Sequence, residues 1–296
     1  MIHDYRVLLF GGSGGFSQRV LERLVASEIS IAAVALFGYG PIHVARSSPI
    51  PVAEPRCEHE ILSVVDRHTL PVVYLEELQS SQTLERLSAY SPDFILCACF
   101  PRVLPEALYR LPSVACLNLH PSMLPAYRGP TPLFWQLRNG ESNTGVTLHL
   151  VTDVIDGGEI VLQRQYSLAD GLSHQEINRQ LADLGAELFV QCLEMYAAGC
   201  AKSVAQKKGS YFPLPKAGDF SLSTEWPARR AFNFIRGTSH KGVAYNLSTA
   251  GQTFTISMAK DYQDSGALDH EWKRSGDSLS IQFTPGILHA VGELVR

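Results

Sequence analysis

Several features are scarce in this 296-residue sequence, and each scarcity excludes a class of protein. It contains no run of roughly 18 apolar residues, so it has no candidate membrane-spanning helix. Its first residues, MIHDYRVLLFGG, lack a basic stretch followed by an apolar segment and a cleavage site, so we expect a cytoplasmic protein. A formal net charge of only -4 gives no electrostatic indication of a nucleic-acid partner.

Cysteine is also scarce, with six residues scattered along the chain. Cys97 and Cys99 form a Cys-x-Cys pair, but no second pair completes a tetrahedral zinc site, so we expect no metal. Because Cys97, Cys99 and Cys116 lie in apolar runs, we interpret them as small buried hydrophobic residues.

The first half of the sequence alternates between short apolar runs and segments with helical spacing. The predicted strands are 5–10, 29–38, 70–75, 92–100 and 113–120. The predicted helices are 16–27, 57–68 and 82–90, with a short helical connection at 101–111. A loop rich in Pro, Gly and Ser is expected at 39–56. This alternation predicts an α/β fold with a doubly wound, mostly parallel, Rossmann-like sheet.

The pattern changes after about residue 143. Residues 144–151 and 158–166 alternate between apolar and polar and are joined by TDVIDG, which predicts an antiparallel ribbon. Ser173 and Glu176 form a capping box for a long helix that Gly199 ends. Short strand-like runs follow a polar linker. We therefore predict a catalytic domain at 1–206 and a small, β-rich, barrel-like domain at 207–296.

The glycine-rich turn GGSGGF, residues 11–16, lies between the first strand and the first helix. Backbone N–H groups and the helix dipole at such a turn can bind an anion, so Gly12, Ser13 and Gly14 form a weak candidate site for the acceptor. The turn lacks the spaced G-x-G-x-x-G pattern of dinucleotide sites, and no acidic residue ends the second strand. The alternative interpretation is a tight turn that requires glycine for packing alone.

Polar side chains at the end of the strand 113–120 are more informative. Asn118 and His120 are two positions apart, so they point to the same side of the strand, at the edge where open α/β sheets bind ligands. A loop with four prolines follows, and then TDVIDGG brings Asp153 and Asp156 into a tight turn. An amide, an imidazole and a carboxylate suit acyl transfer without a protein nucleophile. The alternative is that these residues only cap the strand and shape the turn.

The segment NLHPSMLPAYRGPTPLFWQLRNGESNTGVTLHLVTDVIDGGEIV resembles the folate-dependent formyltransferase family, and the likeness extends over roughly residues 5–200. Residues 122–125 match the family's Ser-Leu-Leu-Pro element with Met for Leu, a volume-conserving exchange. The resemblance implies 10-formyltetrahydrofolate as co-substrate and no metal. It places Asn118, His120 and Asp156 on the family's catalytic positions; Asp156 matches, rather than Asp153, because it directly precedes the two glycines.

The same resemblance implies a mechanism. Asn118 would donate an N–H to the tetrahedral oxyanion, and His120 would carry a proton from the amine toward the departing folate nitrogen. A further role for His120, sharing the oxyanion, stays open. Asp156 would orient His120, stabilise its charge or hold a relay water, and these roles stay open as well. The residues predicted to contact folate are Phe100, Arg102, Val103, Leu104, Ser122, Leu124, Pro125, Val151 and Asp153.

The acceptor is less well defined by the sequence. Family members that act on initiator tRNA typically carry Arg-Ala-Phe-Asn-Pro-Trp-Pro, whereas this sequence reads FIRGTSHKGVAYNL, without Pro-Trp-Pro. Residues 207–296 hold 11 Lys and Arg against 8 Asp and Glu, a modest excess for a tRNA-binding domain. We therefore predict a small-molecule amine acceptor. The alternatives are a methionyl-tRNA formyltransferase, a 10-formyltetrahydrofolate hydrolase and a non-catalytic folate-binding protein.

Overall fold

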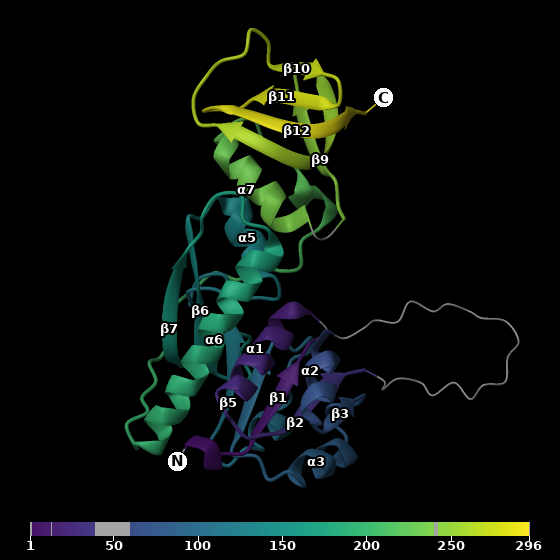
Figure 1. Ribbon diagram of the computed structural model, residues 1–296. Helices are drawn as coiled ribbons and strands as arrows, with labels where there is room; N and C mark the ends of the chain where they lie inside the picture. The colour runs from purple at the N-terminus through teal and green to yellow at the C-terminus, as the bar shows by residue number, and fades with distance from the viewer. Residues whose placement is uncertain (1, 13, 39–59, 240–241, 296) are drawn as a thin grey trace, which may run out of the picture. The chain divides into compact units, whose positions relative to one another are not determined.

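The computed structural model describes residues 2–12, 14–38, 60–239 and 242–295. Figure 1 shows the ribbon and labels many of its helices and strands. The predicted loop 39–56, the start of the predicted helix at 57–59 and Ser13 lie outside the described residues. The chain forms two compact units. One comprises Met1–Pro125, Val146–Arg164 and Arg179–Lys208, and the other Ala126–Gly145, Gln165–Asn178 and Gly209–Arg296.

A seven-stranded sheet has the order β3-β2-β1-β4-β5-β6-β7. Its strands are β1 (Val7–Gly11), β2 (Ile31–Phe37), β3 (Val72–Leu75), β4 (Phe94–Ala98), β5 (Ala115–His120), β6 (Asn143–Leu150) and β7 (Ile160–Ser167). The pairs among β1 to β5 are parallel, and β6 runs antiparallel to β5. The predicted α/β class with a mostly parallel sheet is confirmed.

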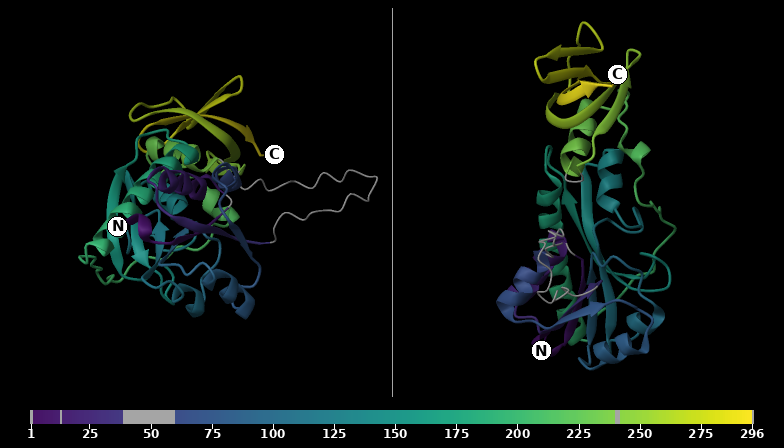
Figure 2. Two further views of the ribbon diagram at one scale, coloured as in Figure 1. Left: turned by 60° about the horizontal axis from the view of Figure 1, so that its bottom comes forward. Right: turned by 90° about the vertical axis from the view of Figure 1, so that its right-hand side faces the viewer.

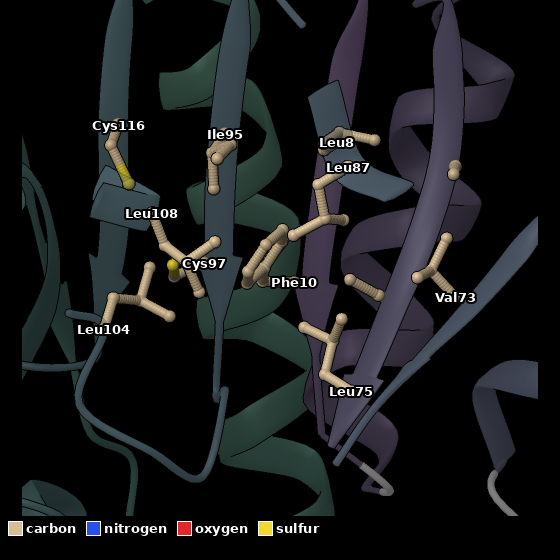
Figure 3. Close-up of a cluster of buried hydrophobic side chains, with 12 residues drawn as sticks. Leu8, Phe10, Val73, Leu75, Leu87, Ile95, Cys97, Leu104, Leu108 and Cys116 are labelled. Carbon is tan, nitrogen blue, oxygen red and sulfur yellow. The ribbon is translucent and has the colours of Figure 1, made fainter. Parts of the chain in front are cut away.

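Helices cover both faces of the parallel strands. They are α1 (Gly15–Ala26), α2 (Glu60–His68), α3 (Ser81–Ser88), α4 (Glu106–Tyr109) and α6 (His174–Ala197), preceded by the short η1 (Ile2–Asp4). Leu87 of α3 and Leu108 of α4 join a buried cluster on one face, shown in Figure 3. On the other face Phe94 packs edge-on against Phe189 of α6, with the ring centroids 6.1 Å apart, a separation that aromatic pairs favour.

The same cluster contains Cys97 and Cys116, which are buried as predicted. Burial, together with the neighbouring Cys97 thiol, raises the pKa of Cys116 well above its usual value, which keeps this thiol protonated and unreactive. The prediction is wrong for Cys99. This residue follows the end of β4 in a left-handed conformation, with φ 56°, and is exposed.

The second unit contains an antiparallel sheet with the order β10-β11-β12-β9-β8, seen from two directions in Figure 2. Its elements are α5 (Pro132–Asn139), η2 (Ala217–Phe220), α7 (Ala228–Thr238), β8 (Tyr245–Thr249), β9 (Gln252–Gln263), β10 (Trp272–Ser275), β11 (Ser278–Gln282) and β12 (Ile287–Leu294). Phe134 of α5 packs against Phe220 and Phe234, which ties α5 to the C-terminal residues. The predicted β-rich C-terminal region is confirmed.

Residues 126–145 and 165–178 group with the C-terminal residues in this unit, whereas the predicted domains divide the chain once, after residue 206. That division stays a prediction. None of the described helices is long and apolar enough to cross a membrane.

Candidate active site

The candidate site is built on the end of β5. Asn118 and His120 extend from the same face of the strand as Cys116, because side chains two positions apart share a face. The antiparallel neighbour β6 places His149 directly opposite Asn118 and Thr147 directly opposite His120. Four polar side chains from two strands therefore meet at the carboxyl edge of the parallel sheet.

A tight turn brings Asp156 to this edge. The N–H of Gly157 donates to the carbonyl of Val154 at 3.0 Å, and Asp156 adopts a left-handed conformation with φ 51°. A Cβ added at Gly158 would lie 1.8 Å from the carbonyl oxygen of Leu150, so only glycine fits there. The second glycine of the Asp-Gly-Gly sequence is thus required by the backbone path that carries the carboxylate to the site.

The three predicted catalytic side chains lie together, and two of them approach the same oxygen of the third. Asp156 Oδ1 lies 3.5 Å from Asn118 Nδ2 and 3.5 Å from His120 Nδ1. The side chains of His120 and Asp156 are 5% and 12% exposed, so water screens their interaction only weakly. These separations are at the long limit of hydrogen bonding, which is common in active sites without bound substrate.

His149 belongs to the same group and was not predicted. Its Nδ1 lies 2.9 Å from the carbonyl oxygen of Leu150, which can only accept, so this nitrogen carries the proton. The other nitrogen, Nε2, is then an acceptor and receives the N–H of Asn118 at 3.0 Å. Nε2 also lies 3.7 Å from Asp156 Oδ1.

The sequence carried one signal for His149. In TGVTLHLV the apolar residues Val146, Leu148 and Leu150 alternate with Thr147 and His149, which places the imidazole on the opposite face from these three residues. What the sequence does not give is the register with β5, and only that register puts His149 opposite Asn118.

The predicted loop wall after His120 is fixed by two side chains of the adjacent strands. The hydroxyl of Thr147 donates to the carbonyl of Ser122 at 2.7 Å and accepts the N–H of Leu124 at 3.1 Å. Gln163 donates to the carbonyl of Leu124 at 2.7 Å, and the Leu124–Pro125 peptide bond is cis. Residues 122–125 therefore form a rigid wall beside Asn118 and His120.

The remaining residues predicted to contact folate have different environments. Phe100 is half-buried with its ring centroid 5.2 Å from that of Phe10, and the Arg102 guanidinium lies 4.2 Å from the ring of Phe37. Val103 is 61% exposed, whereas the Leu104 side chain is buried in the core. In the turn after β6, Val151 packs against the core and Asp153 is exposed. The Leu104 side chain is therefore occupied by core packing, and the predicted folate contacts of these residues stay a prediction.

One backbone N–H of the glycine-rich turn, that of Gly12, has a partner within the protein. The N–H of Gly12 donates to Ser17 Oγ at 2.9 Å, and that hydroxyl donates to the carbonyl of Ala98 at 2.6 Å. A Cβ at Gly12 would lie 2.5 Å from the carbonyl oxygen of Cys99, so packing alone requires glycine. Gly14 precedes the first turn of α1 without a side-chain cap. The weak acceptor site at Gly12, Ser13 and Gly14 stays a prediction.

A separate cavity of about 320 Å³ lies within the second unit, and none of the predicted site residues lines it. Its Asp170 accepts hydrogen bonds from Arg229, Asn233 and Tyr262 at 2.6 to 2.7 Å. Burial opposes ionisation of Asp170, but these donors and the Arg229 charge outweigh it and lower its pKa. In the described part of the chain, no three His, Cys, Asp or Glu side chains gather as metal ligands.

Comparisons with known proteins agree on one family. The model of the formyl transferase family matches residues 6–193. A methionyl-tRNA formyltransferase of Thermotoga sp. is 30% identical over 274 residues, 91% of this chain and 85% of that protein. One of Staphylococcus aureus is 32% identical over 80% of this chain and 74% of that protein.

A solved structure shares the fold over the whole chain. It is an N-formyltransferase of Helicobacter canadensis in complex with folinic acid and dTDP-3-aminofucose. It aligns with a TM-score of 0.66 at 17% identity and covers 100% of both chains.

Proposed function

Since this chain belongs to the formyl transferase family, we propose that it transfers a formyl group from 10-formyltetrahydrofolate to the amine of a small-molecule acceptor. The observation that carries the proposal is the convergence of the Asn118 amide and the His120 imidazole on the Asp156 carboxylate, each 3.5 Å from its Oδ1. No serine or cysteine lies among these groups, so the acceptor amine itself is the nucleophile. The folinic acid in the Helicobacter enzyme supports a folate donor.

Asn118 supplies the stabilisation of the oxyanion in this mechanism. The amine attacks the formyl carbon, and negative charge develops on the formyl oxygen. One N–H of the Asn118 amide is held by His149, and the other points at Asp156 Oδ1 across 3.5 Å. This second, weakly engaged N–H is the one available to the oxyanion. A single such donor contributes roughly 3 kcal/mol to stabilisation of the transition state.

His120 moves the proton in this mechanism. It accepts a proton from the attacking amine, and the same proton goes to the folate nitrogen as the bond between that nitrogen and the formyl carbon breaks. Asp156, 3.5 Å from His120 Nδ1, stabilises the imidazolium that exists between these two transfers. His149 cannot share this role, because its Nδ1 proton is bound to a carbonyl and its Nε2 already accepts a hydrogen bond.

Methionyl-initiator tRNA is the second candidate acceptor, because the curated relatives are named methionyl-tRNA formyltransferases. Residues 230–236 read Arg-Ala-Phe-Asn-Phe-Ile-Arg, so the first half of the stretch typical of those enzymes is present and Pro-Trp-Pro is not. Without prolines, α7 continues to Thr238 and buries Phe234 and Ile235. This departure, with the modest positive charge of 207–296, favours the small-molecule acceptor.

A formyl-transfer assay with each acceptor in a separate reaction distinguishes the two candidates. Purified protein would receive 10-formyltetrahydrofolate with a panel of amino sugars and amino acid derivatives, and in parallel with charged initiator tRNA at near-physiological salt. We expect formylation of a small amine and little of the tRNA. Efficient tRNA formylation that falls steeply as salt rises would make the second candidate the correct one.

A further inference from the structure

Gln206 lies in the polar segment that follows α6. This segment runs beside the start of β7, where Val204 and Ile160 exchange two backbone hydrogen bonds of 2.8 Å. Residues 202–210 are otherwise exposed, and Gln206 alone among them is half-buried. A half-buried amide side chain in an otherwise exposed polar segment indicates that this side chain has hydrogen-bond partners elsewhere in the protein.

Those partners are the backbone carbonyls of the catalytic turn. Gln206 Nε2 lies 2.9 Å from the carbonyl oxygen of Asp156 and 2.6 Å from that of Gly158. Both atoms can only accept, so the amide nitrogen must face them, and both of its protons are used. The contacts connect segments that are far apart in the sequence.

This arrangement fixes the peptide unit that follows Asp156. Its carbonyl accepts from Gln206, and its N–H, on Gly157, donates to the carbonyl of Val154 at 3.0 Å. The unit is therefore held at both ends. The two residues on the C-terminal side of Asp156 are glycines, which restrict backbone rotation least of all residues. Without the amide of Gln206, this part of the turn would therefore be held less firmly.

We propose that Gln206 is a positioning residue for catalysis, which holds Asp156 where its carboxylate reaches His120. The proposal rests on the proposed function, because it assumes that Asp156 takes part in formyl transfer. Gln206 acts on the reaction through the turn, by way of the backbone on either side of Gly157. A displacement of about 1 Å at a catalytic group can lower the rate roughly a hundredfold, so a loosened turn has a measurable consequence.

The test compares two variants with a matched control. Gln206→Met keeps the length of the side chain and removes both donors, and Gln206→Glu places carboxylate oxygens against the two carbonyls. Gln191→Met is the control, because Gln191 is an exposed glutamine on α6 whose side chain accepts a 3.4 Å hydrogen bond from Arg164. For each protein, kcat and the KM for the folate donor would be measured.

We expect kcat to fall roughly 10- to 100-fold in both Gln206 variants, with the folate KM within about twofold of the wild type. The control should match the wild type. An unchanged kcat in Gln206→Met overturns the proposal. So does a rise in KM with kcat unchanged, since that pattern assigns Gln206 to donor binding instead.

Hydrogen exchange of the peptide spanning 152–159 gives a readout that needs no activity. The Gly157 amide should exchange at least several-fold faster in Gln206→Met than in the wild type, and unchanged exchange would show that Gln206 does not hold the turn. If the wild-type protein transfers no formyl group, the proposed function fails on its own. The proposed role of Gln206 in catalysis is then overturned as well. The exchange result still decides whether Gln206 holds the turn 152–159 in place.

Discussion

The hydrogen bond from Asn118 to His149 leads to a quantitative prediction. His149→Leu removes the acceptor that holds one N–H of Asn118 at 3.0 Å, so the 3.5 Å contact with Asp156 alone would resist rotation of the amide about its Cβ–Cγ bond. A correctly aimed oxyanion donor is worth roughly 3 kcal/mol, about a hundredfold in rate. Loss of orientation removes part of this contribution, and we expect kcat to fall roughly 10- to 100-fold.

The same substitution also has a cost in stability. It leaves two polar groups of half-buried residues, the Asn118 N–H and the Leu150 carbonyl, without the imidazole partner. An unsatisfied buried group costs about 1–3 kcal/mol, against a typical unfolding free energy of roughly 5–15 kcal/mol for a domain. The variant should therefore fold with a lowered Tm, so that its kcat can be measured well below the transition.

Two further variants make the result interpretable. His149→Gln offers a side-chain oxygen that can accept from Asn118, and we expect it to recover most of the lost kcat. His68→Leu, at the exposed end of α2, controls for the loss of an imidazole and should behave as the wild type. If His149→Leu folds and turns over at the wild-type rate, the argument that His149 orients Asn118 is refuted.

The remaining predictions concern the other site residues and the second unit. His120→Ala should abolish formyl transfer while calorimetry still shows a cooperative unfolding transition; near-normal turnover would remove the imidazole from the mechanism. Asn118→Asp should lower kcat more than Asn118→Ala with little change in folate KM, because it places a negative charge beside the oxyanion. Deleting residues 209–296 uncovers Phe134, so the shortened chain should self-associate on size-exclusion chromatography. A monodisperse monomer would contradict the packing described for α5.

Local patterns were sufficient to predict much of the sheet and part of the site. Asn118 and His120 follow from the two-residue period of one strand, and the left-handed Asp156 lies in a turn that Asp-Gly-Gly already indicates. The helix α5 was missed because it begins at Pro132, directly after a loop rich in proline. That proline occupies the first helical turn, where a missing N–H costs nothing.

His149 and Gln206 could not be predicted for a different reason. Each acts through a partner that is distant in the sequence. His149 meets Asn118 only through the pairing of β5 with β6, and Gln206 meets the catalytic turn only because the segment after α6 returns to β7. A strand register depends on the whole sheet, so a single sequence without its fold does not specify such contacts.

The most direct test of the proposed mechanism is the stoichiometry of formyl transfer by the wild type and Asp156→Asn. The substitution keeps the shape of the side chain and removes the charge that faces His120 Nδ1 at 3.5 Å. With 10-formyltetrahydrofolate and the accepted amine, the wild type should form one formylated amine for each tetrahydrofolate released. Asp156→Asn should retain donor binding and lose at least roughly a hundredfold in kcat. Equal turnover by the two proteins, or tetrahydrofolate released without a formylated amine, would contradict the mechanism.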